Sequence, residues 1–166
     1  QKVQSYEGRY LHAYWYLKIE DLDFEVAKFK IDWLYSQRRH QEAYVVACKS
    51  YEHHKRTRMP RELLEVLVEL CLVLGLAGEA DGFMVEVLST GAQDPSLKWL
   101  RLRKEMRFGR WEAAYQAGLD YLEFRPHEYR VCLLMERACR QLEWFDRAEH
   151  YAREAATIKH NYLRNL

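Results

Sequence analysis

The sequence predicts an all-α fold, an α-solenoid of about four helical hairpins preceded by an extra N-terminal helix. One observation is a repeated small residue: Ala80, Ala114 and Ala148 lie 34 residues apart, and Ala43 lies 37 residues before Ala80. A period of this size is typical of stacked helical hairpins. The other observation is that apolar residues follow a helical spacing nearly throughout, with little of the alternation that marks strands.

The elements follow from this frame in chain order. An N-terminal capping helix occupies residues 1–23, hairpins occupy 24–59, 60–94, 95–126 and 127–160, and residues 161–166 form a tail. The paired helices are predicted at 24–36 with 40–53, 60–74 with 79–90, 95–107 with 111–124, and 127–142 with 145–158. Pro60 and Pro95 suit the first turn of a helix, where a missing N–H costs little. Gly109 suits a tight turn because it has no Cβ. We expect residues 1–166 to form a single helical-repeat domain.

At the four alanines the chain resembles the tetratricopeptide-repeat (TPR) superfamily in a divergent form, over about residues 24–160. The resemblance implies that the two helices of each hairpin approach closely at the alanine, with an aromatic residue such as Trp111 or Phe145 packed beneath the turn. The chain departs from the family in two ways. Its first helices lack the W-x-x-L-G-x-x-Y pattern. The position four residues after each alanine, where the family prefers an aromatic, holds Ala47, Met84, Gly118 and Ala152. The alternative folds are another α-solenoid and a non-repeating helical bundle.

Composition limits the class of protein. An apolar content of 49% excludes a disordered chain, and a net charge of +1 excludes an overall electrostatic nucleic-acid binder. Four cysteines without C-x-x-C spacing predict free thiols in an intracellular compartment, cytoplasmic or nuclear. The most apolar run, 63–77, contains two glutamates and is too short to span a bilayer, so no membrane association is expected. Because the chain begins with Gln1, we expect it to be a domain of a longer protein or complex.

The resemblance also implies a binding surface, because in this family the first helix of each hairpin lines a groove that holds extended peptides. The candidate partner-binding residues are Trp99, Arg103, Arg107, Arg130, Leu133, Arg137 and Arg140, with Met106 and Gln141 at neighbouring groove positions. Glutamates 62, 65 and 69 take the equivalent places in the second hairpin. Such a groove would be acidic in its first half and basic in its second. The basic half would bind an acidic or phosphorylated protein segment or a neighbouring subunit. The alternative is a solvated face whose arginines pair with Glu105 and Glu136.

A second basic feature lies between the first two hairpins and consists of Lys55, Arg56, Arg58 and Arg61. It is either a contact for RNA phosphates or a solvated loop. The stripe formed by Tyr6, Tyr10 and Tyr14 either packs onto the next hairpin or stacks on a partner.

Signals for chemistry are absent from the sequence. No phosphate-binding loop, nucleophile elbow or zinc-protease motif occurs, and His53 and His54 have no further ligand at metal spacing. Cys132 and Cys139 share one helix face and are predicted core residues. We therefore expect no catalytic residues, metal or cofactor. The leading hypothesis is a non-catalytic scaffold or adaptor domain, the second is a helical-repeat RNA-binding module, and the third is a regulatory segment of an enzyme.

Overall fold

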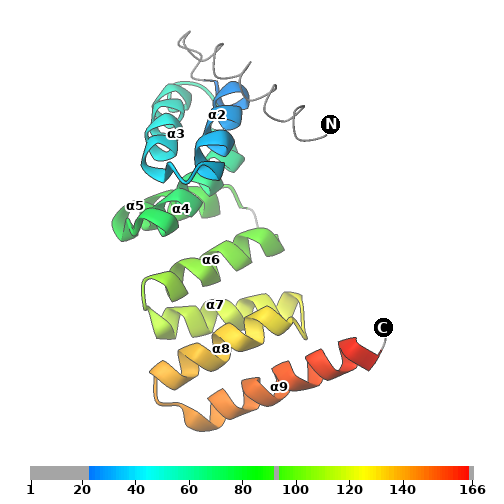
Figure 1. Ribbon diagram of the computed structural model, residues 1–166. Helices are drawn as coiled ribbons and strands as arrows, with labels where there is room; N and C mark the ends of the chain where they lie inside the picture. The colour runs from blue at the N-terminus through cyan, green and yellow to red at the C-terminus, as the bar shows by residue number, and fades with distance from the viewer. Residues whose placement is uncertain (1–22, 92–93, 165–166) are drawn as a thin grey trace. The chain divides into compact units, whose positions relative to one another are not determined.

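The computed structural model describes residues 23–91 and 94–164, and within these ranges the chain forms eight helices and no strand (Figure 1). The helices are α2 (Phe24–Ser36), α3 (His40–His54), α4 (Arg61–Leu74), α5 (Ala77–Ser89), α6 (Pro95–Arg107), α7 (Trp111–Phe124), α8 (Tyr129–Gln141) and α9 (Phe145–Arg164). The fold is therefore all-α and TPR-like, as the sequence predicted. The predicted N-terminal helix, with its tyrosine stripe, lies outside the described residues.

Consecutive helices pair as four antiparallel hairpins, α2 with α3, α4 with α5, α6 with α7, and α8 with α9 (Figure 1). The predicted bounds of α2, α6 and α7 agree with the structure, and those of α3, α4, α5 and α8 differ by one or two residues. The main difference is α9, which continues to Arg164. Residues 161–164 of the predicted tail are therefore helical. Contacts divide the chain into an N-terminal unit, Gln1–Thr90, and a C-terminal unit, Gly91–Leu166. A single domain over residues 1–166 stays a prediction.

The four hairpin turns share one backbone motif that sequence reasoning did not find. Each contains one residue with positive φ at the same distance before its alanine: Arg38 (58°), Gly75 (76°), Gly109 (67°) and Glu143 (59°). The next N–H then bonds back to the end of the first helix, from Arg39 to Leu34 O, Leu76 to Cys71 O, Arg110 to Glu105 O, and Trp144 to Cys139 O. This Schellman-type closure satisfies carbonyls that the helix end leaves free. It sets the register of the alanine that follows.

The four alanines are buried where the helices of each hairpin meet, with Ala43, Ala80 and Ala114 at 0% exposure and Ala148 at 1%. In the N-terminal unit Ala43 joins a core built around Phe24, Ile31, Leu34, Leu63, Leu67 and Leu70. In the C-terminal unit Ala114 and Ala148 join a core built around Leu102, Met106, Tyr115, Tyr121, Val131, Met135 and Tyr151. The close approach expected at each alanine is thus the arrangement that the structure has.

Of the two aromatic residues predicted to pack beneath the turns, Trp111 does so and Phe145 does not. Trp111 packs against the core of the C-terminal unit, and its ring lies 3.6 Å from the position that a Cβ on Gly109 would take. Phe145 is 64% exposed, so its predicted packing is wrong. Trp144, one residue earlier, packs on that core and meets the Tyr115 ring edge-on at 5.2 Å. Relative to the positive-φ residue, the packed ring of this turn comes one residue earlier than in the turn at Gly109.

Gly118 of α7 explains one departure from the family pattern. A Cβ built on this residue would lie 1.9 Å from Met135 Sδ, 3.1 Å from Met135 Cγ and 3.2 Å from Met135 Cε. Met135 belongs to α8 and is fully buried. The methionine of the next hairpin thus fills the space that an aromatic residue would take in the family pattern. Only a residue without a side chain lets α7 and α8 approach this closely.

Candidate interaction surface

Helix α8 has one buried and one exposed side. The buried side consists of Val131, Cys132, Met135, Ala138 and Cys139. The exposed side consists of Arg130, Leu133, Arg137 and Arg140, and we call these four residues the α8 face. Burial raises the pKa of the Cys132 and Cys139 thiols, so both stay neutral in the core, where the sequence analysis placed them.

The arginines of the α8 face differ in their surroundings. Arg140 donates a hydrogen bond from Nε to Oε1 of Glu136, one turn earlier, at 3.0 Å. The alternative of a solvated face expected this glutamate to pair with an arginine. The Arg137 guanidinium lies 5.9 Å from the centre of the Trp111 ring, which holds it over an aromatic surface. The Arg130 guanidinium has no hydrogen-bond or ion-pair partner within residues 23–91 and 94–164. Leu133, between them, is 39% exposed.

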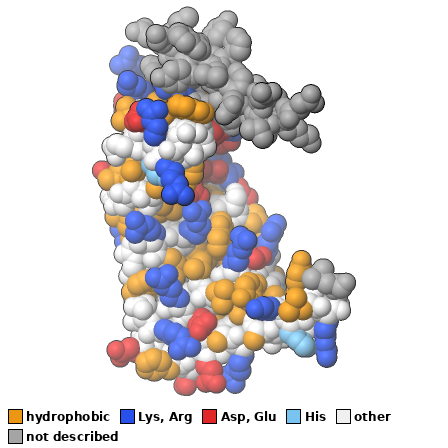
Figure 2. Space-filling view, viewed as in Figure 1, with side chains coloured by type: hydrophobic (Ala, Val, Ile, Leu, Met, Phe, Trp, Pro, Cys, Tyr) orange, Lys and Arg blue, Asp and Glu red, His pale blue; other side chains and the backbone are white. Residues whose placement is uncertain are grey.

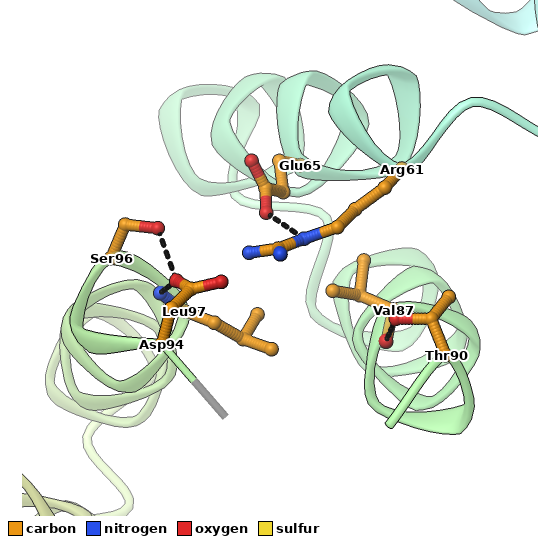
Figure 3. A network of polar contacts seen from close by, with 7 residues as sticks. All are labelled: Arg61, Glu65, Val87, Thr90, Asp94, Ser96 and Leu97. Atoms are coloured by element: carbon orange, nitrogen blue, oxygen red, sulfur yellow. Dashed lines mark hydrogen bonds and ion pairs between the residues drawn. The ribbon is translucent and has the colours of Figure 1, made fainter. Parts of the chain in front are cut away.

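Helix α6 supplies the other candidate residues and begins with a well-defined cap. Asp94 accepts hydrogen bonds from the Leu97 N–H at 3.1 Å and from the Ser96 hydroxyl at 2.5 Å, and Pro95 fits the first turn (Figure 3). This start places Trp99 half-buried with its ring edge toward Tyr121, at 6.2 Å between centroids.

The remaining candidates on α6 differ in how deeply they are buried. Arg103 is half-buried and Arg107 is exposed. Met106, predicted as a groove residue, is 8% exposed and belongs to the core of the C-terminal unit, so that prediction is wrong. Met106 points inward because it follows Leu102 by one helical turn on the same side.

Glu105 does not neutralise the candidate arginines. Its carboxylate is 7% exposed and pairs with the buried Lys104 ammonium at 2.6 Å, and Arg110 Nη1 lies 3.6 Å from its other oxygen. The alternative of a solvated face expected Glu105 to pair with candidate arginines, but Glu105 pairs with Lys104 and Arg110 instead. Glu105 acts within the C-terminal unit, as part of a buried ion pair at the end of α6.

A cavity of about 460 Å³ lies entirely within the C-terminal unit, where α6 and α8 begin and α7 ends. We call it the Trp99 cavity. Its lining residues are Asp94, Pro95, Ser96, Trp99, Tyr121, Arg125, Glu128 and Arg130. It therefore joins two predicted residues, Trp99 and Arg130, with residues that the sequence analysis did not single out. Figure 2 shows Lys and Arg side chains next to hydrophobic ones on this side of the C-terminal unit.

Two of the three glutamates predicted for the acidic half of the groove have partners within the N-terminal unit. Glu62 pairs with Lys28 of α2, and Glu65 accepts a hydrogen bond from Arg61 Nε at 2.7 Å (Figure 3). Glu69 also makes an interaction within the chain. The pairings of Glu62 and Glu65 reduce the negative charge that these two residues present to solvent.

The four cations of the predicted basic loop differ in their surroundings. Lys55 pairs with Glu52 at 2.8 Å, and Arg61 is the first residue of α4. The Arg58 backbone carbonyl lies 3.0 Å from Nδ1 of the buried His54, which ties the loop to the end of α3. Arg56 lines a separate cavity of about 710 Å³ along α3, with Tyr44, Val45 and Cys48 among its other lining residues. Burial raises the pKa of the Cys48 thiol.

Two further findings concern the described part of the chain. No group of three or more His, Cys, Asp or Glu residues there has the geometry to hold a metal ion. None of the helices described there is both long and apolar enough to cross a membrane.

The residues of the Trp99 cavity that sequence reasoning missed include Tyr121, Arg125 and Glu128. Tyr121 was hidden because it follows the core spacing of α7, and its ring is in fact 7% exposed. Arg125 and Glu128 flank Pro126 in the segment between α7 and α8. An arginine and a glutamate beside a proline carry no helical periodicity. Only the packing of α6 against α7 brings them near Trp99.

The comparisons with known proteins find solved structures of the same fold. No family model matches the sequence, and no curated protein matches it. The structure "MamA MSR-1 C2" has a TM-score of 0.81 at 14% identity and covers 97% of this chain and 91% of its own. The structure "MamA AMB-1 P212121" has a TM-score of 0.81 at 13% identity and covers 96% and 93%. MamA is a TPR-like protein. The likeness establishes that this chain has a TPR-like helical-repeat fold.

Proposed function

We propose that this chain is a non-catalytic protein-interaction module, a scaffold or adaptor domain that binds an acidic or phosphorylated segment of a partner protein. The α8 face carries the proposal. It presents a half-exposed leucine between three exposed arginines on one side of a helix whose opposite side is fixed in the core. Arginine is among the residues that contribute most to binding at protein interfaces, and the exposed leucine adds apolar area that a partner can bury. The TPR-like fold supports this class of function by analogy.

The charge of the α8 face suits a partner that carries carboxylates or phosphates. An arginine guanidinium binds either group with two parallel hydrogen bonds, which adds direction to the attraction between the charges. The stacking of Arg137 on Trp111 would hold one guanidinium ready for such a contact and lower the entropy lost on binding. Arg130 has no partner in the described residues that a ligand would have to displace.

The experiment compares two variants of equal charge change. Arg137→Glu with Arg140→Glu reverses the α8 face, whereas Arg153→Glu with Lys159→Glu reverses two exposed cations of α9. The intact protein and both variants are used to purify bound proteins from the cells that produce it, after circular dichroism has shown equal folding. The proposal expects at least one protein retained by the wild type and the α9 variant but lost by the α8 variant.

Two outcomes would contradict the proposal. The α8 variant would retain every protein that the wild type binds, or all binding would disappear after nuclease treatment and fall steeply with salt. The second outcome is the behaviour of an RNA-binding module, because counterions released from phosphates make such binding salt-dependent.

A further inference from the structure

The Trp99 cavity combines an aromatic wall and two arginines. Trp99 and Tyr121 form the wall with their rings at 61°, and both rings are held by the core of the C-terminal unit. Aromatic rings favour such edge-to-face contacts, and a further aromatic ring could add to the pair in the same way. The wall is therefore suited to a flat, apolar group.

The two arginines of the cavity are free to bind a ligand. Arg125 and Arg130 are both exposed, and neither guanidinium has a hydrogen-bond or ion-pair partner among the residues the structure describes. Elsewhere on the C-terminal unit, Arg101 pairs with Asp120 at 3.2 Å and Arg140 pairs with Glu136. Two guanidiniums without such partners therefore line the same cavity as the aromatic wall.

Two carboxylates also line the cavity, and they have different effects. Asp94 is occupied as the cap of α6, where it accepts two hydrogen bonds (Figure 3). Its charge is also stabilised by the positive end of that helix. Glu128 is half-buried at the start of α8 and makes no side-chain capping bond. Glu128 therefore opposes an anion in the cavity and limits the affinity of the two arginines.

We propose that the Trp99 cavity binds an aromatic side chain of a partner protein segment, with an acidic residue next to it held by Arg125 and Arg130. This inference rests on the proposed function and names the feature of the partner that the module recognises. The aromatic side chain lies against Trp99 and Tyr121, and the carboxylate of its neighbour meets the guanidiniums at the rim. A volume of about 460 Å³ is within the range of pockets that hold small ligands and leaves room for an aromatic side chain.

The test uses three short peptides with blocked ends, in which a central tyrosine is flanked by glutamates, a central tyrosine is flanked by lysines, or a central alanine is flanked by glutamates. Binding to the intact, ¹⁵N-labelled protein is followed through the tryptophan indole N–H signals, and Trp99→Phe assigns the signal of that ring. We expect the glutamate–tyrosine peptide to shift the Trp99 signal at about 1 mM, with little shift from the other two.

Three variants separate the roles of the charges. Arg125→Glu should weaken the glutamate–tyrosine peptide about tenfold or more, the loss that corresponds to one charge-assisted hydrogen bond. Glu128→Gln should strengthen it about twofold by removing a like charge, a gain that an unfolded protein cannot produce. Arg125→Glu combined with Arg130→Glu should reverse the preference toward the lysine–tyrosine peptide.

The inference is overturned if the glutamate–tyrosine peptide leaves the Trp99 signal unchanged, or if the two tyrosine peptides bind equally. It is also overturned if Glu128→Gln weakens binding of the acidic peptide. The proposed function is judged separately, because its variants change Arg137 and Arg140, which do not line the cavity. If the peptides leave the Trp99 signal unchanged and the Arg137→Glu, Arg140→Glu variant still loses a partner protein, only this inference is rejected.

Discussion

Replacement of Gly118 by alanine tests the packing of α7 against α8. Alanine is favoured over glycine in a helix by about 1 kcal/mol, so an open helical site gains stability from this change. At Gly118 the new Cβ would lie 1.9 Å from Met135 Sδ, and two more atoms of that side chain lie within 3.2 Å. Met135 is fully buried, so its side chain can move only if neighbouring core side chains adjust as well.

The chain offers a matched control in Gly82, which is exposed within α5 and would place a new Cβ with nothing within 4 Å. Gly82→Ala should raise the free energy of unfolding by about 1 kcal/mol. Gly118→Ala combines the same helical gain with an overpacking cost of about 1–3 kcal/mol. The difference between the two variants, about 1–3 kcal/mol, therefore isolates the clash with Met135.

The assay is urea unfolding followed by circular dichroism, with hydrogen exchange in α5 and α7 to assign each change to its own unit. Adding Met135→Ala should rescue Gly118→Ala in part, because the new Cβ then fills space that the shorter side chain leaves. The coupling in this double-mutant cycle should be favourable and about 0.5–3 kcal/mol. The reasoning is refuted if Gly118→Ala stabilises the protein as much as Gly82→Ala, or if the cycle shows no coupling.

Three further predictions concern stability. His54→Ala should lower the free energy of unfolding by about 1–3 kcal/mol in urea titrations, because Nε2 of the buried imidazole accepts the Phe24 N–H at 3.1 Å; an unchanged midpoint would contradict this. Burial raises the pKa of Cys71 to about 12, so the folded thiol keeps a proton that the unfolded thiol loses above about pH 9. Stability should therefore fall as the pH rises from about 9 toward 12, and Cys71→Ala should flatten that dependence in titrations repeated at each pH. Gly109→Ala should cost about 1–2 kcal/mol and Glu143→Gly should cost none, because both positions have positive φ; equal losses in thermal unfolding would argue against the shared turn motif.

The hairpins could be predicted from sequence because their signals are local. Each alanine sits at a fixed place after its turn, and Asp94 with Pro95 marks the start of α6 within a few residues. Phe145 was misassigned because the family position of the turn aromatic was applied, whereas Trp144 supplies the packed ring. The positive φ of Glu143 was not expected either. A glutamate in that conformation has no sequence signature, whereas Gly75 and Gly109 were visible as turn residues.

The α9 extension was missed because residues 159–164 have few apolar positions to mark a helix. Tyr162 and Leu163, which could have marked it, are exposed at 67% and 60%. The other four residues of that segment are polar, and the segment continues α9 with its side chains exposed. A hydrophobic period can therefore locate the part of a helix that packs, but it cannot locate the part that extends into solvent.

The candidate surface could be predicted only in part, because ion pairs depend on which helices meet. The spacing on α8 correctly separated exposed from buried residues. The pairing of Lys28 with Glu62, and of Arg101 with Asp120, joins residues of different helices and has no counterpart in local spacing. For the same reason, Arg125 could not be brought near Trp99 without the structure.

Site-specific photo-crosslinking tests the central claim, which is that the α8 face contacts a partner protein. A photoreactive phenylalanine analogue replaces Leu133 on that face or, as the control, Phe145, which is exposed on α9 of the same unit. After irradiation in the cells that produce the protein, crosslinked proteins are identified by mass spectrometry. The account predicts a discrete protein crosslinked from position 133 and not from position 145. Equal crosslinking from the two positions, or none from position 133, would contradict it.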